Sequence, residues 1–341
     1  MLTTPEQSAV RKSLQPLFKS NAVDIQRGGL EMLNILSPKL QVSDYLEDVL
    51  PLIGSADSAV KQKSLEFVGI AGNEANVPAL LEALSDETHA TIFTALTRIL
   101  SQLKTPDAFI KNLISGMTRH TEYAENFILL FTAVVKTMPA EQPPATLADG
   151  TPAKTSTPSM LTPTSYDAIF STLSPYIAAH KTSQGMMDLI AEMGKHGHEE
   201  SIVQLTQMFC ANDYPTLKIS QHLDKLFDIQ REIACNSAAI LDALKIGLSS
   251  EQKTIQLKCL SYLTNFSSAS DETKNVFCGI LMPMLTGRDS EIALNACFAL
   301  AKVGNKTLVP TLKSILKSES HPDFKKALET TIKTLKGNSW W

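Results

Sequence analysis

The residues best suited to metal chemistry lie in one short turn, GKHGHEE at 194–200. His196, His198, Glu199 and Glu200 offer imidazole nitrogens and carboxylate oxygens, which are ligands that zinc and other divalent metals take. The His-x-His pair lacks a third ligand at a fixed spacing, and His180 is the nearest histidine before it. We therefore predict a solvated turn here, with no metal and no cofactor.

Five cysteines could in principle supply redox or nucleophilic chemistry, and all of them lie in the C-terminal half of the chain: Cys210, Cys235, Cys259, Cys278 and Cys297. No C-x-x-C spacing occurs among them. Several fall on apolar faces of helical segments, as Cys297 does in ALNACFALAKV. These features predict reduced thiols in a helical core and a reducing compartment.

Motifs that carry catalysis on known folds are missing from the chain. It contains no H-E-x-x-H, no G-x-S-x-G, no G-x-x-x-x-G-K-[ST] and no G-x-G-x-x-G. We therefore expect no catalytic residues and no enzyme activity.

Three threonines precede prolines in a segment rich in proline, threonine and alanine. The segment reads MPAEQPPATLADGTPAKTSTPSMLTP at 138–163, and the threonines are Thr151, Thr157 and Thr162. Its composition cannot build a core, so we predict a disordered insertion over 139–163. Thr-Pro pairs are typical of proline-directed phosphorylation, which would add negative charge to this segment.

Two positions for this insertion follow from its flanks, which are apolar helical segments at 123–138 and 165–180. The insertion could link two separate helical arrays, or it could be an enlarged turn between the two helices of one repeat. We favour the second interpretation, because 123–138 alone would be half a unit with an uncovered face.

Charge and hydropathy exclude several partners. The formal net charge is −4, and lysine and arginine are scattered along the chain, so we expect no nucleic-acid surface. No run of about eighteen apolar residues occurs, so we expect no membrane span. The chain ends in Trp340 and Trp341, which could dock into a partner, fold back on the last helix or mark a truncation.

The elements that must position these residues follow from one repeated phrase, GNEANVPALLEAL at 72–84 and GNKTLVPTLKSIL at 304–316. Before each copy, apolar positions step by four, three, one and three, which is one stripe of an α-helix. After it, Val-Pro opens a second apolar stripe, and proline suits the first turn of a helix. Each unit therefore reads as helix, glycine turn, helix.

The ends of these helices have their own signals. Asp57 and Asp289 stand where an N-cap belongs, and we expect Asp86 to cap the next unit in the same way. We expect Gly72 and Gly304 to be C-caps in the left-handed conformation. A two-helix unit of this size buries too little apolar surface to fold alone, so units must stack on their neighbours.

The same pattern, weakened, covers most of the chain, and we predict about eight or nine units in a single all-α solenoid over residues 1–341. The phrase resembles the HEAT repeat, and EIALNACFALAKVGNKTLVPTLKSIL is similar to an armadillo repeat. The resemblance is strong at 57–86 and 289–318 and weak at 120–180 and 211–250. It implies a curved α-solenoid that binds proteins, usually along its concave face.

These features favour a protein-interaction scaffold or adaptor in the cytoplasm or nucleus, with one or more proteins as partners. We expect the second helices to line the inner surface, with core positions such as Leu80, Leu81 and Leu84. Outward positions Glu82, Lys111 and Ser314 occupy one slot in three units and differ in charge, which suits selective recognition. The alternatives are a transport receptor of the karyopherin type or a vesicle-coat adaptor and, less favoured, a HEAT-like lyase.

Overall fold

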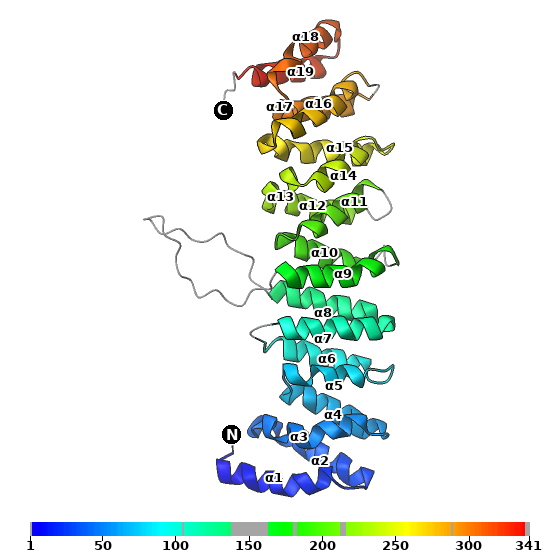
Figure 1. Cartoon of the computed structure of the whole chain (residues 1–341), viewed down its shortest axis with the longest axis vertical. Coiled ribbons are helices and arrows are strands. Elements are labelled where there is room, and N and C mark those ends of the chain that lie inside the picture. Colours follow the sequence, from blue (N-terminus) through cyan, green and yellow to red (C-terminus); the bar gives the residue numbers. More distant parts are fainter. Residues whose placement is uncertain are drawn as a thin grey trace, which may run out of the picture. The chain divides into compact units, whose positions relative to one another are not determined.

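The chain is helical throughout the part that the structure describes. The computed structural model describes residues 2–103, 106–137, 163–179, 183–211, 216–287 and 289–337, and these contain 19 α-helices, short 3-10 helices and no strand (Figure 1). The all-α helical-repeat prediction is confirmed. The threonines of the predicted insertion, Thr151, Thr157 and Thr162, lie outside the described residues, as do Trp340 and Trp341.

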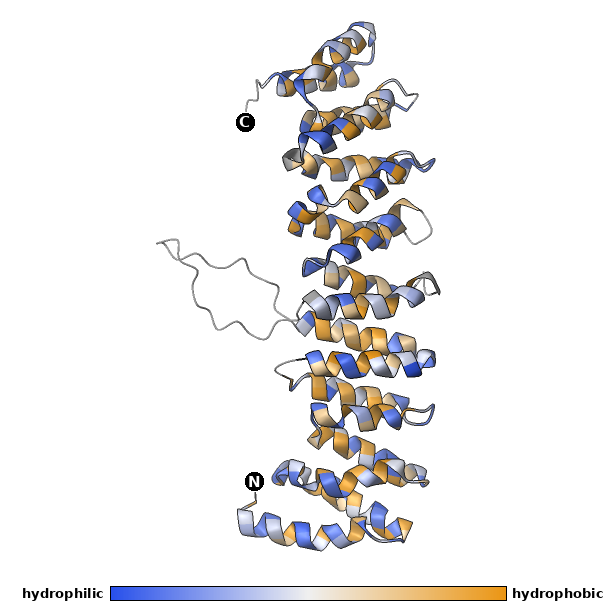
Figure 2. Cartoon of the chain, in the orientation of Figure 1, coloured by the Kyte–Doolittle hydropathy of each residue, from blue (hydrophilic) through white to orange (hydrophobic). Residues whose placement is uncertain are grey.

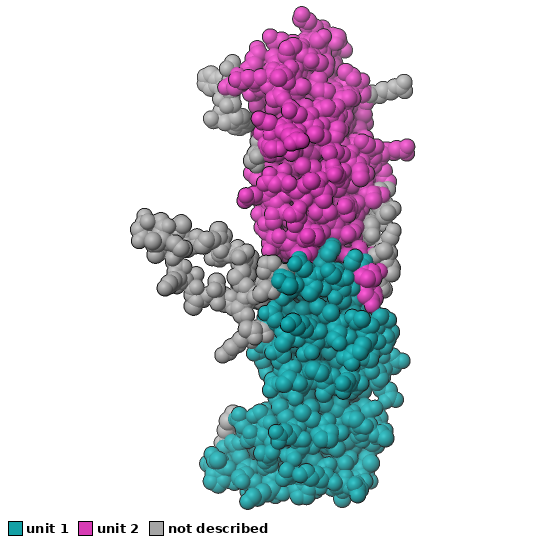
Figure 3. Space-filling model, viewed as in Figure 1, with its two compact units in different colours: residues 1–174 teal, residues 175–341 magenta. Residues whose placement is uncertain are grey.

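The chain divides into two compact units, residues 1–174 and 175–341 (Figure 3). The division falls inside helix α9 (Pro163–Ala179), at Pro175. Proline within a helix removes a backbone hydrogen bond. A single array over residues 1–341 stays a prediction.

In the first unit, successive helices pack as two series. The helices that precede α9 are α1 (Thr4–Phe18), α2 (Val23–Leu36), α3 (Leu46–Val49), α4 (Ser58–Ala71), α5 (Val77–Glu82), α6 (His89–Leu100), α7 (Asp107–Arg119) and α8 (Ala124–Thr137). The first helices of the pairs pack in the order α2, α4, α6, α8, and the second helix α5 packs on α7. This every-other-helix packing is what stacked helix pairs require.

The second unit repeats this arrangement. Its helices are α10 (Gln184–Lys195), α11 (Glu199–Cys210), α12 (Thr216–Ile229), α13 (Arg231–Asn236), α14 (Ala238–Leu248), α15 (Lys253–Leu263), α16 (Asp271–Met284), α17 (Ser290–Val303), α18 (Val309–Ser318) and α19 (Pro322–Leu335). One series runs through α10, α12, α15, α17 and α19, and the other through α11, α14 and α16. Apolar and polar residues alternate around most of these helices, as in an amphipathic array (Figure 2).

The two copies of the repeated phrase have the same local structure. Asp57 Oδ1 accepts a hydrogen bond from the backbone N–H of Val60 (2.9 Å), and Asp289 Oδ1 accepts one from Ile292 (3.1 Å), so both N-caps are confirmed. Asn73 then caps the 3-10 turn Glu74–Asn76, and Asn305 caps Lys306–Leu308. Val-Pro begins the second helix in both copies, as predicted.

The left-handed conformation that we predicted for Gly72 and Gly304 is wrong. Gly72 has φ −74° and ψ 164°, and Gly304 has φ −74° and ψ 168°, which are extended and not left-handed. A Cβ on Gly72 would clash with the carbonyl oxygen of Val68, and a Cβ on Gly304 would clash with that of Leu300. Close backbone approach therefore explains glycine here.

Two other turn predictions also need correction. The N-cap position of the next helix is Thr88, whose side chain makes no capping hydrogen bond, and not Asp86. The Asp86 carboxylate instead accepts a hydrogen bond from the Tyr123 hydroxyl (2.7 Å). Gly194 lies within α10, and the left-handed turn comes at Gly197, with φ 85°.

The start of α9 bears on the predicted insertion. The Ser165 hydroxyl donates a 2.7 Å hydrogen bond to Asp107 Oδ1 at the start of α7. This contact places the first residues of α9 beside a second helix of the first unit. It favours an insertion between the two helices of one pair, an interpretation that stays a prediction.

Candidate functional site

The residues predicted to meet a partner lie on second helices of the pairs. Glu82 ends α5, Lys111 is in α7 and Ser314 is in α18, and all three side chains are exposed. Behind them Leu80, Leu81 and Leu84 are buried, as predicted. Glu82 and Lys111 lie in the first unit, on two helices that pack together, whereas Ser314 belongs to the second unit.

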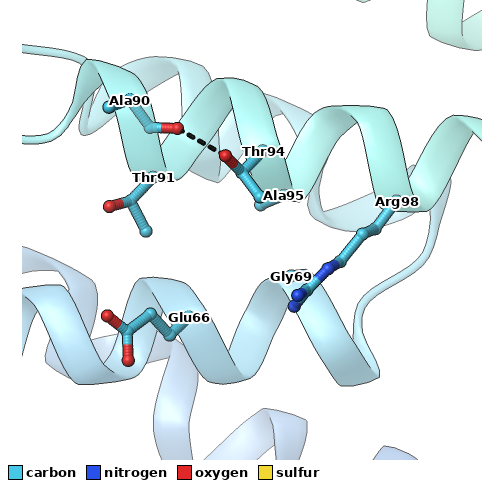
Figure 4. A pocket seen from close by; sticks show the side chains of 7 residues that line it. All are labelled: Glu66, Gly69, Ala90, Thr91, Thr94, Ala95 and Arg98. Atoms are coloured by element: carbon cyan, nitrogen blue, oxygen red, sulfur yellow. Dashed lines mark hydrogen bonds between the residues drawn. The ribbon is translucent and has the colours of Figure 1, made fainter.

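A groove that the sequence analysis did not find lies between two first helices, α4 and α6 (Figure 4). Its volume is about 370 Å³. The residues that line it are Glu66, Gly69, Ala90, Thr91, Thr94, Ala95 and Arg98. Most of these side chains are small, so the lining is shallow and only its two charged residues are long.

The helices α4 and α6 approach each other closely at one point in this groove. A Cβ on Gly69 would lie 2.8 Å from the Cβ of Ala95 and 3.0 Å from its Cα. Glycine facing alanine therefore brings the two helix backbones together. The polar contact between the side chains of Gln62 and Thr91 joins the same two helices one to two turns earlier.

Two opposite charges lie in this lining without neutralising each other. Figure 4 shows the Arg98 side chain extending from α6 toward α4, where Gly69 leaves room for it. Among the described residues its guanidinium has no hydrogen bond and no ion pair. Glu66 is exposed on α4, and its carboxylate contacts the amide of Gln62 at 3.3 Å. The groove can thus hold a small side chain and present one cation and one anion to it.

The predicted solvated turn at 194–200 has a structural role. His198 is buried and caps α11, because its Nδ1 accepts from the backbone N–H of Ser201 (3.2 Å) and lies 2.8 Å from the Ser201 hydroxyl. His196 is the C-cap of α10, and Glu199 and Glu200 form the exposed first turn of α11. The prediction of a fully solvated turn was therefore wrong for His198.

The predicted core thiols are confirmed, since all five cysteines are buried and none of them forms a disulfide. Cys210 and Cys259 have their sulfurs 3.9 Å apart, over Gly247 of α14. The hydrogen bond with Cys210, followed by burial, raises the pKa of Cys259 well above that of a free thiol. Burial also raises the pKa of Cys297 to about 11. Thiols of this kind are poor nucleophiles at neutral pH.

The described residues thus form a helical-repeat protein with exposed second-helix side chains and a groove between α4 and α6. No family model and no curated protein matches the chain. Among solved structures it is similar to importin beta, with 9% identity over 96% of this chain and 46% of that one, and a TM-score of 0.44. It is also similar to Kap95p, with 10% identity over 96% of this chain and 45% of that one, and a TM-score of 0.46. An engineered protein shows 14% identity over 96% of this chain and 99% of that one, with a TM-score of 0.40.

The chain spans less than half the length of the importin beta and Kap95p chains. All three TM-scores are below 0.5, so the architecture is argued from the helix packing described above. None of the described helices combines the length and the hydropathy that a membrane crossing requires.

Proposed function

We propose that this protein is a HEAT- or armadillo-type scaffold or adaptor that binds another protein along the exposed faces of its helix pairs. The observation that supports it most is the packing of every other helix, which buries the apolar stripes and leaves a row of differing side chains outside. Such a surface suits an extended partner, because successive repeats offer successive contacts.

Two features of the first unit are the proposed contacts. Glu82 and Lys111 provide opposite charges on adjacent second helices, and the groove between α4 and α6 provides Arg98 and Glu66. In the second unit, Ser314 occupies the corresponding second-helix slot. We propose that these second-helix residues line the inner, concave face and meet the partner there. Thr151, Thr157 and Thr162 remain proposed phosphorylation sites.

The chemistry of the described residues supports binding rather than catalysis. The cysteines are buried, and the lining of the groove, which includes Glu66 and Arg98, contains no histidine and no cysteine. Buried cysteines that form no disulfide suit a reducing compartment, so we propose the cytoplasm, with the nucleus as a further location.

The test is affinity purification with quantitative mass spectrometry. The bait proteins are the wild type, the charge-reversed variant Glu82→Lys/Lys111→Glu and the groove variant Arg98→Glu. Loss of the same specific partners from a charge-reversed bait, with unchanged helical circular dichroism, is the expected result. Equal recovery by all three baits would refute both proposed contacts.

The same experiment distinguishes the alternatives predicted from the sequence. A transport receptor or a vesicle-coat adaptor would be recognised by the proteins recovered. A lyase would instead convert a substrate, and for that it would need an enclosed pocket with paired titratable groups.

A further inference from the structure

The segment from the end of α17 onward carries a charge that the rest of the chain does not share. Residues 302–341 contain eight lysines, no arginine and three acidic residues, whereas residues 1–301 contain 23 lysines and arginines against 32 acidic residues. All eight lysines are exposed: Lys302, Lys306, Lys313, Lys317, Lys325, Lys326, Lys333 and Lys336. The prediction that lysine and arginine are scattered along the chain is therefore wrong for residues 302–341.

Four of these lysines gather at one edge of the second unit, which we call the basic edge: Lys302, Lys306, Lys333 and Lys336. Helices α17 and α19 run side by side in the same direction, because Thr331 Oγ1 donates to the carbonyl of Cys297 (3.0 Å) and Leu335 lies against Gly304 further along. Their C-terminal ends therefore coincide. No lysine of the basic edge forms an ion pair with any described residue.

Two lysines of the basic edge lie where a helix favours positive charge. Lys302 and Lys333 lie in the last turns of α17 and α19, where the helix dipole favours a cation. The acidic residues of α19, Asp323 and Glu329, precede that last turn. The fold thus tolerates a local excess of positive charge here.

The two copies of the repeat show that the fold itself does not need these lysines. Residues 57–88 carry two lysines and six acidic residues, but the aligned residues 289–320 carry four lysines and three acidic residues. Lys302 stands where the first copy has Ile70, and Lys306 where it has Glu74. The same scaffold is acidic in one copy and basic in the other, so the charge is a property of the surface.

An exposed aromatic residue adjoins the basic edge. Phe298 lies one helical turn before Lys302 on α17, and 46% of its surface is exposed. The first copy has Glu66 at this position. A lysine cluster beside an exposed phenylalanine is complementary to a segment with carboxylates and one apolar side chain.

We propose that the basic edge and Phe298 bind a short acidic segment of a partner protein, with an apolar side chain of the segment against Phe298. A long polyanion fits less well, because the excess of acidic residues in the rest of the chain would repel it. The patch also has no arginine for bidentate phosphate contacts, and the apolar face of α19 is buried and so cannot enter a lipid surface. This surface does not involve Glu82, Lys111 or the α4–α6 groove.

The test uses the full chain and a fluorescent glutamate-rich peptide with one central leucine. Anisotropy should show binding that weakens at least about tenfold between low and high salt, as screening of surface charges requires. The variant Lys302→Glu/Lys306→Glu/Lys333→Glu/Lys336→Glu should lose this binding, and the milder lysine-to-glutamine set should weaken it. Phe298→Ala should weaken it severalfold.

The first copy of the repeat supplies the matched control. Glu74→Lys/Glu87→Lys changes charge on the same scaffold at a different place, and it should leave peptide affinity at the basic edge unchanged. Circular dichroism and the melting temperature show whether each variant is folded. The proposal is overturned if the peptide does not bind, or if the glutamine variant binds as the wild type does. It is also overturned if single-stranded DNA or phosphatidylserine vesicles bind more tightly than the peptide.

Discussion

Gly72 and Gly304 each end a first helix where a backbone carbonyl lies too close for any side chain. Their φ and ψ angles suit any residue. Glycine is required at these two positions because a side chain would meet the oxygen of Val68 or Leu300. That oxygen also accepts the hydrogen bond that closes the helix, at 2.7 Å for Gly72 and 2.8 Å for Gly304. A larger residue would have to break this hydrogen bond or move the turn.

Replacing either glycine by alanine should therefore destabilise the protein, by about 1–3 kcal/mol, since the contact is with backbone that cannot turn aside. Urea denaturation measures the effect. Gly28→Ala is the matched control, because a Cβ on Gly28 in α2 meets nothing within 4 Å. It should stabilise by roughly 0.5–1 kcal/mol through helix propensity. An equal effect of all three substitutions would contradict the contact argument.

The Asp289 carboxylate caps the N-terminus of α17 and also forms an ion pair with Lys253 of the preceding repeat. Lys253 at 2.8 Å, followed by the backbone N–H of Ile292, lowers the pKa of the Asp289 carboxyl. A lowered folded-state pKa means that the ionised group stabilises the fold above its unfolded-state pKa, which is about 3.9. This stabilisation is lost as pH falls through the folded-state pKa.

Asp289→Ala should therefore lower the urea midpoint at pH 7 and have a much smaller effect once the pH is below the folded-state pKa. Asp289→Asn, which keeps the capping oxygen and loses the charge, should fall between the wild type and Asp289→Ala at pH 7. If the gap between wild type and Asp289→Asn were the same at both pH values, the ion pair with Lys253 would not be its source.

At the scale of helices, the contact of α4 with α6 sets the width of the groove. Gly69 and Ala95 allow the close approach, and the small residues Ala90, Thr91 and Thr94 leave space beside it. The same small side chains thus explain both the groove and the close packing of α4 on α6. The same helices bury Leu65, Leu96 and Ile99 completely, so the contact is part of the core.

Gly69→Ala should destabilise the protein by about 1–3 kcal/mol, because an added methyl group meets Ala95 at less than van der Waals distance. The double variant Gly69→Ala/Ala95→Gly should recover part of this loss, since it removes the facing methyl group. A double-mutant cycle on urea midpoints measures the coupling, which residues in contact show at about 0.5–3 kcal/mol. Strictly additive effects would mean that the two residues do not touch.

The sequence predicted helix pairs best where its repeat is best preserved. Val-Pro and the aspartate N-caps are local signals, and both were right in the two strong copies. Residues 42–54 depart from the two-helix pattern, because two 3-10 helices flank the short α3, with Pro51 at the start of the second one. Local signals cannot show such interruptions where packing decides the backbone.

The candidate sites were harder to predict than the fold. The groove depends on Gly69 meeting Ala95 from another helix, and no spacing within either helix reveals that contact. The basic edge could have been found, because a count of charges over residues 302–341 shows its lysines. What the count cannot give is the alignment of α17 with α19, which brings Lys302 and Lys336 to one end.

At the scale of the whole molecule, each unit is a row of helices that contact mainly their near neighbours. The core of the first unit includes Leu96 of α6, and that of the second includes Leu300 of α17, both completely buried. In such rows the free energy of unfolding is close to the sum of the stability of each repeat and the energy of each interface between neighbouring repeats. A cavity in one place should thus loosen nearby helices first.

Leu96→Ala and Leu300→Ala should each cost about 2–5 kcal/mol, because each leaves a cavity in a packed core. Hydrogen exchange with mass spectrometry should show the lost protection in α4, α6 and α8 for Leu96→Ala. For Leu300→Ala it should appear in α15, α17 and α19. If either substitution removed protection equally from residues 1–174 and 175–341, the chain would unfold as one cooperative block, and the description of each unit as a row of locally stabilised helices would be wrong.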